Sequence, residues 1–164
     1  MNKKRTSRKA VYVRTLASAP THGGPAPTIS LDVQWRARLH KALDGILAFS
    51  VSYGDKRMTI RGDSPDGRTI LELIEKKNGV LAEASLQLAL GNTDHLEAIK
   101  LGCWTLLYLT ALFPAWANVR EWMKEAISWA TETGDPFTKH CNGYRIVCGH
   151  DPDANVVDFR VIEN

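Results

Sequence analysis

Acidic residues are missing from the first 31 positions of this 164-residue chain. The chain holds 21 Lys and Arg against 18 Asp and Glu, and all 18 acidic residues fall at or after Asp32. The first 31 residues therefore carry a net charge of +6 and the remainder −3. This distribution is typical of a basic arm that attracts anions, attached to a mildly acidic body. The six cations of the arm are Lys3, Lys4, Arg5, Arg8, Lys9 and Arg14.

Cysteine is scarce as well. The chain has three, an odd number without framework spacing, which argues against a disulfide scaffold and favours a reducing compartment. The apolar stretch Ala10–Val13 is far shorter than the roughly 7–15 residues of a secretory signal. We therefore expect a cytoplasmic protein. The acid-free, Ser- and Thr-bearing start also fits an organellar transit peptide, and the sequence leaves that alternative open.

No apolar run is long enough to predict a membrane span. The 19 residues between Lys100 and Arg120 carry no charge, but Pro114 lies within them. Because proline ends or kinks a helix, the strongly apolar part is about 13–14 residues, whereas a span needs about 20. The segment therefore predicts a buried core helix.

Recognisable catalytic motifs are absent too. The chain contains no Gly-x-Ser-x-Gly turn, phosphate-binding loop, dinucleotide fingerprint or His-Glu-x-x-His zinc motif. Residues 63–66 and 150–153 do contain carboxylates, but Asp and Pro populate turns for backbone reasons alone. The sequence favours a non-catalytic protein without a cofactor. A small enzyme that uses loop carboxylates is an alternative that the sequence leaves open.

The chain divides into an arm and a single domain. Residues 1–29 read as a basic arm and linker, and Ala19–Pro27 holds three Pro and two Gly in nine residues. Such a stretch is expected to be extended and flexible. Residues 30–164 have the length and composition of one α+β domain.

The periodicity of apolar residues predicts the elements of this domain. Helices are expected at about 31–47, 80–90, 94–113 and after Pro114 to about 133. A three-strand meander is expected over 48–75, and a hairpin from Tyr144 onward. Because strand and helix blocks are segregated, we predict an α+β fold. In it, an antiparallel sheet, made of the meander and the C-terminal hairpin, packs against about four helices.

The basic arm favours a role in nucleic-acid binding. Clustered cations neutralise phosphates without reading sequence, and basic segments that order on binding are common. We therefore expect a small accessory protein whose partner is the backbone of DNA or RNA. The alternative is a protein-interaction module, such as an inhibitor or immunity-type protein or a homodimer, whose basic tail is incidental. The candidate nucleic-acid residues are the six arm cations together with Arg36, Arg38 and Lys41 of the first helix.

Two further groups of residues have side chains suited to binding. His140, Cys141, Cys148 and His150 are zinc-ligand types within eleven residues, but their spacing matches no zinc-finger or ribbon pattern, so no metal is predicted. Trp122 and Trp129 are seven residues apart and share a helix face. They pack in the core or, alternatively, form a partner surface, because Trp is enriched at interface hot spots.

Overall fold

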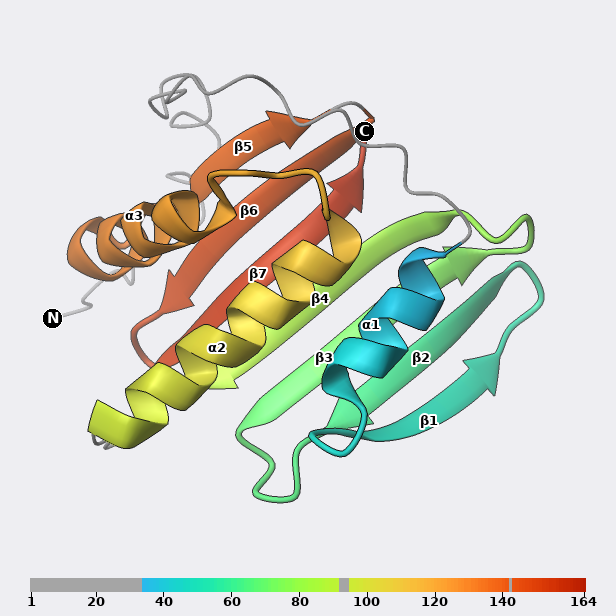
Figure 1. Ribbon diagram of the computed structural model, residues 1–164, viewed down its shortest axis with the longest axis horizontal. Helices are drawn as coiled ribbons and strands as arrows, with labels where there is room; N and C mark the ends of the chain where they lie inside the picture. Colours follow the sequence, from blue (N-terminus) through green and yellow to red (C-terminus); the bar gives the residue numbers. More distant parts are fainter. Residues whose placement is uncertain (1–33, 92–94, 142) are drawn as a thin grey trace, which may run out of the picture.

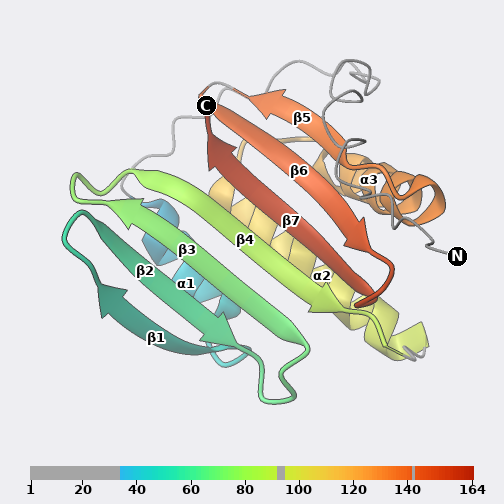
Figure 2. The ribbon, with the colours of Figure 1, turned by 180° about the vertical axis from the view of Figure 1, so that it is seen from behind.

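The computed structural model describes residues 34–91, 95–141 and 143–164. They form one seven-stranded antiparallel sheet, with the described helices all on one face of it (Figure 1), and Figure 2 shows the face that no described helix covers. The predicted α+β class is therefore confirmed. The elements in chain order are α1 (Trp35–Leu43), β1 (Ala48–Tyr53), β2 (Arg57–Asp63), β3 (Thr69–Lys76), β4 (Leu81–Ala89), α2 (His95–Leu112), α3 (Val119–Thr133), β5 (Phe137–Cys141), β6 (Tyr144–Asp151) and β7 (Val156–Glu163).

The two halves of the sheet meet at the β4–β7 pair. The strand order is β1-β2-β3-β4-β7-β6-β5, so β1 to β4 form one meander and β5 to β7 a second. The two are joined by the antiparallel pairing of β4 with β7. The predicted C-terminal hairpin is β6 and β7, and it belongs to the same sheet as the first meander.

The region predicted as a helix over 80–90 is strand β4, and this prediction was wrong. A register shift opposite Ile74 and Glu75 inserts an extra residue into β4, because Glu75 pairs with Leu81 and Ile74 with Glu83. Leu81 and Ala84 are therefore both buried although they are three residues apart, which imitates the spacing of a helix. As a consequence the first meander has four strands, and the described residues contain three helices rather than about four.

The helices follow the sequence prediction more closely. Helix α1 buries Trp35, Leu39 and Leu43, as its periodicity predicts. It ends earlier than expected because Gly45 adopts a φ of 75°, a left-handed conformation that glycine tolerates. Helices α2 and α3 lie on either side of Pro114, as predicted. The predicted arm and linker, residues 1–29, lie outside the described residues.

The core lies between the sheet and the helices, and aromatic side chains fill much of it. Trp122 packs 5.0 Å from Trp116 and 5.9 Å from Phe137, measured between ring centroids. The hydroxyl of the fully buried Tyr108 donates a hydrogen bond of 3.4 Å to the carbonyl oxygen of Phe159, which joins α2 to β7. Such rings combine large buried areas with specific packing geometry and stabilise the layer of helices on the sheet.

Candidate functional site

Helix α1 begins at the end of the sheet where the β1–β2 and β3–β4 turns lie. The guanidinium of Arg36 forms an ion pair with the carboxylate of Glu75, near the end of β3. Nε of Arg38 donates a hydrogen bond of 2.9 Å to the carbonyl oxygen of Ala111, near the end of α2. Because Arg36 and Arg38 are in the first turn of α1, the described body begins at this end (Figure 1).

Two hairpin turns at this end carry basic side chains. Lys56 and Arg57 lie in and after the β1–β2 turn, Lys77 lies in the β3–β4 turn, and all three are exposed and have no ionic partner among the described residues. Lys76 is ion-paired with Glu163. Alternate turns of a meander lie at the same end of a sheet, and these two turns are about 10 Å apart because two strand spacings separate them. We call Lys56, Arg57 and Lys77 the basic end.

The β3–β4 turn presents Lys77 for local backbone reasons. Gly79 has a φ of 81°, and its N–H donates to the carbonyl oxygen of Lys76 at 3.0 Å. Oδ1 of Asn78 accepts a hydrogen bond of 3.2 Å from the N–H of Val80. This Lys-Asn-Gly turn chemistry closes the hairpin and leaves the Lys77 side chain on the outside.

An exposed aromatic ring accompanies these cations. Tyr53 ends β1 at the same end of the sheet, and 82% of its surface is exposed. It pairs with Met58 across the β1–β2 hairpin, which places it beside the turn that carries Lys56. A solvent-facing tyrosine next to cations offers a flat surface on which a nucleobase stacks.

The opposite end of the sheet is acidic. Asp66 in the β2–β3 loop, Asp135 after α3, and Asp151 and Asp153 around the β6–β7 loop are all exposed there. The hydrogen bond from the Ser64 hydroxyl, 2.5 Å long, and then that from the N–H of Arg68, lower the pKa of Asp66. Oδ1 of Asp151 accepts the N–H groups of Asp153 and Ala154 at 3.0 and 3.1 Å. These carboxylates therefore shape turns.

The three cations of α1 that were predicted to bind nucleic acid, Arg36, Arg38 and Lys41, differ in their contacts. Arg36 and Arg38 hold α1 to β3 and α2 through the contacts described above. Lys41 is exposed in the last turn of α1. The six arm cations lie outside the described residues. Lys56, Arg57 and Lys77 are not among the residues predicted from the sequence to bind nucleic acid, although each lies in or beside a turn with glycine and asparagine or aspartate nearby.

The candidate zinc ligands do not converge. Cys141 pairs with Tyr144 and Cys148 with Phe137, so four residues, or about 13 Å, separate the two cysteines along the hairpin. His140 lies on the opposite face of β5 from Cys141, whereas Cys148 and His150 share a face of β6. Burial raises the pKa of Cys141 to about 11 and that of Cys148 further. No cluster of three or more His, Cys, Asp or Glu suited to a metal ion occurs within the described ranges.

The tryptophans proposed as a partner surface are part of the core. Trp122 is 6% exposed and packs against Trp116, Phe137 and Phe159. The prediction that Trp122 forms a partner surface is therefore wrong, because the side chain is buried. Trp129 is half-buried, with its ring 6.3 Å from that of Phe137.

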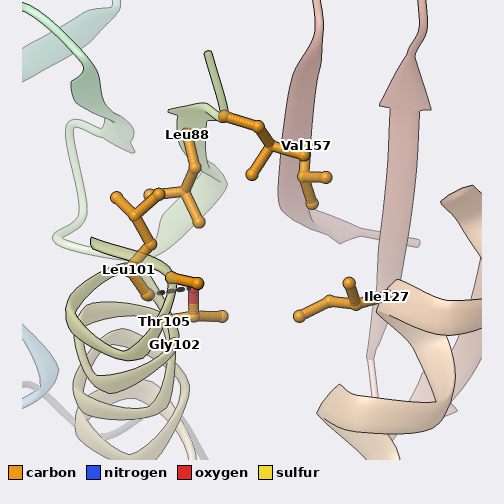
Figure 3. Close-up of a pocket in the computed structure, with 8 residues that line it drawn as sticks. Leu88, Leu101, Gly102, Thr105, Ile127 and Val157 are labelled. Atoms are coloured by element: carbon orange, nitrogen blue, oxygen red, sulfur yellow. Dashed lines mark hydrogen bonds between the residues drawn. The ribbon is translucent and has the colours of Figure 1, made fainter. Parts of the chain in front are cut away.

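An apolar pocket of about 150 Å³ lies between α2 and α3, over β4 and β7 (Figure 3). Thr105 is its most polar side chain, and its hydroxyl donates to the carbonyl oxygen of Leu101 at 3.0 Å. The pocket has no titratable residue in its lining and so no group for acid–base chemistry. It is lined by Leu88, Leu90, Ala98, Leu101, Gly102, Thr105, Ile127 and Val157.

No known protein family matches the chain, and no characterised protein or solved structure is detectably similar to it. None of the helices within residues 34–91, 95–141 and 143–164 has the length and hydrophobicity needed to cross a membrane.

Proposed function

We propose that this protein binds nucleic acid without sequence preference, through its basic arm and the basic end together. The observation that carries the proposal is that the described body starts at Gln34, at the same end of the sheet as Lys56, Arg57 and Lys77. A segment of charge +6 is thus attached at an end where three exposed cations outnumber Asp55, the exposed carboxylate of the same two turns.

The physical basis of binding is the release of counterions. Each Lys or Arg that neutralises a phosphate releases condensed counterions, so affinity falls as salt rises, with a slope of about −0.9 per contact on duplex DNA and about −0.7 on single strands. The twenty residues from Arg14 to Gln34 span at most about 70 Å, so both groups of cations can contact one nucleic acid. Linking two weak contacts in this way raises the affinity of the whole.

Tyr53 supports a preference for single strands. A base stacked on an aromatic ring contributes about 1–3 kcal/mol, and only an unpaired base is free to stack. The ring is 82% exposed at the basic end. The proposed ligand is therefore single-stranded DNA or RNA, bound through its phosphates and one stacked base.

A salt titration of binding tests the proposal. Affinity for unrelated single-stranded DNA and RNA fragments is measured against salt for the wild type, for an arm variant and for a Lys56→Gln/Arg57→Gln/Lys77→Gln variant. We expect the body variant to reduce the slope by up to about 2. The arm variant replaces Lys3, Lys4, Arg5, Arg8 and Lys9 by Gln, and we expect it to weaken binding to every sequence alike.

A control variant removes two exposed cations elsewhere, one fewer than the basic-end variant. Arg120 and Lys124 are exposed on α3, near the other edge of the sheet, and the Arg120→Gln/Lys124→Gln variant should keep the wild-type slope. If this control weakens binding as much as the basic-end variant does, the basic end is not a specific contact. If the wild type does not bind at low salt, the nucleic-acid proposal fails and the protein-interaction alternative becomes the better one.

A further inference from the structure

Helix α2 carries an apolar stripe on the side that faces away from the sheet. Leu96 is 73% exposed, Ile99 50% and Leu107 38%, and Cys103 is also exposed. They are spaced by three or four residues, so they form one face of the helix, which Thr110 continues. The other sides of α2 contact the sheet and lie between α1 and α3 (Figure 1). We call these five residues the α2 stripe.

The stripe is symmetric about Cys103. Ile99 and Leu107 lie four residues to either side of it, and Leu96 and Thr110 lie seven residues to either side. An antiparallel copy of the helix therefore places Cys103 against Cys103, and Ile99 against Leu107. Thr110 does not bring an unsatisfied hydroxyl into such a contact, because its Oγ1 donates to the carbonyl oxygen of Leu106 at 2.7 Å.

We propose that the α2 stripe is a homodimer interface, in which the α2 helices of two copies pack antiparallel around a two-fold axis at Cys103. A two-fold interface uses the same patch on both copies and must therefore be self-complementary, as this stripe is.

The stripe alone is smaller than a stable dimer interface. Residues 96–110 extend over about 21 Å of helix, which at a helix width of about 10 Å gives roughly 200 Å². A stable complex takes roughly 800 Å² from each partner, so the dimer also requires contacts from α1 and α3, which flank α2 on either side (Figure 1).

Charge favours the antiparallel arrangement over the parallel one. The charged residues of α2 are in its first half: Glu97 and Lys100, which contact each other at 3.7 Å. No charged residue follows until Arg120. A parallel pair would place each charge beside the same charge of its copy, whereas the antiparallel pair places it beside the uncharged half. Antiparallel helix dipoles also attract each other.

Association is measured first by sedimentation equilibrium of the full chain. We expect a wild-type dimer whose dissociation constant rises about 30-fold or more in Ile99→Glu and in Leu107→Glu, because each buries a charge at the centre of the contact. Ser52→Glu adds the same charge on the opposite face of the sheet and should leave the dimer intact. Because all three sites are exposed, circular dichroism should show native folding in each variant. A wild type that is monomeric at high concentration, or an Ile99→Glu variant that still dimerises, overturns the proposal.

Disulfide trapping then tests the orientation. Facing helices in contact bring opposed Cα atoms to roughly 4–5 Å, which suits a disulfide. Mild oxidation should therefore link wild-type chains through Cys103, and Cys103→Ser should remove the link. In the Cys103→Ser background, Leu96→Cys alone should not link, but a mixture with Thr110→Cys should. Linkage of Leu96→Cys alone overturns the antiparallel arrangement. A monomer whose Cys103 resists alkylation shows that the stripe is covered by its own chain, which also overturns the proposal.

Discussion

Replacing Arg36 by Met tests whether this cation stabilises the fold or contacts nucleic acid. Arg36 belongs to the set that the sequence predicts to contact nucleic acid, yet in the structure its guanidinium pairs with Glu75. The Glu75 side chain is 7% exposed, so the pair ties α1 to a carboxylate that is nearly out of water. Methionine keeps an unbranched apolar stem beside Trp35 and removes only the charge. We expect the variant to lose stability while it retains nucleic-acid binding.

The expected loss of stability follows from the exposure of the two partners. Removing one member of a fully buried ion pair costs about 3–5 kcal/mol, whereas exposed pairs contribute about 0–1 kcal/mol. Because the Arg36 side chain is 48% exposed and that of Glu75 is 7% exposed, we place the cost of Arg36→Met between these limits, at about 1.5–3 kcal/mol. Glu75→Gln in the same chain removes the unpaired charge, so the double variant should recover part of the loss.

Urea denaturation of the wild type, both single variants and the double variant measures this coupling. The same proteins are then titrated with salt in the presence of single-stranded DNA. We expect reduced midpoints for Arg36→Met with an unchanged salt slope, the reverse of the result for the basic-end variant. A loss of stability below about 0.5 kcal/mol would refute the reasoning about the buried carboxylate, and a flatter salt slope would show that Arg36 contacts phosphate instead.

Four further outcomes are expected. Tyr53→Ala should lower the affinity for single strands by about 1–3 kcal/mol and leave duplex binding unchanged, and an equal loss on both would exclude stacking. Phe159→Ala, at a fully buried ring, should cost about 3–5 kcal/mol in urea denaturation, and a cost below 1 kcal/mol would contradict its central place in the core. Because burial raises the pKa of Cys141 to about 11, its contribution to stability is present below its unfolded pKa of about 8.5 and is lost as pH rises toward 11. Cys141→Ala should therefore flatten the alkaline decline in stability, and an unchanged decline would assign it to other groups. Ser64→Ala should raise the pKa of Asp66 in an NMR titration, since the Ser64 hydroxyl is the main cause of its lowered value.

The spacing of apolar residues predicted those elements in which the buried positions repeat with one regular period. The stripe of α1 and the alternation of β6 and β7 can be read from neighbouring residues, and all three elements are present. The pattern over 81–84 misleads because the bulge opposite Ile74 and Glu75 is a property of the pairing, not of β4 itself. The short strand β5 has a mixed composition and was not predicted; its place at the sheet edge depends on pairing with β6.

The candidate site was predictable only in part. The charge of the arm is visible in composition alone, because it needs no partner. The contribution of Lys56 and Lys77 depends on which turns share an end of the sheet, and that follows from the number of strands. Once 81–89 is assigned to a helix, Lys77 no longer lies in a hairpin turn. The pairing of Arg36 with Glu75 joins residues 39 apart and could not be read from the sequence.

The pairing of β4 with β7 also determines when the sheet can be completed during synthesis of the chain. β4 ends at Ala89, but its partner strand begins at Val156. At a synthesis rate of about 5–20 residues per second, β4 is an open edge for about 3–13 s before β7 exists. An unpaired apolar edge is a template for pairing between chains. Truncations that remove β7 should therefore aggregate during synthesis, and the apolar β4 residues Leu86 and Leu88 are the place where we expect chaperones to bind first.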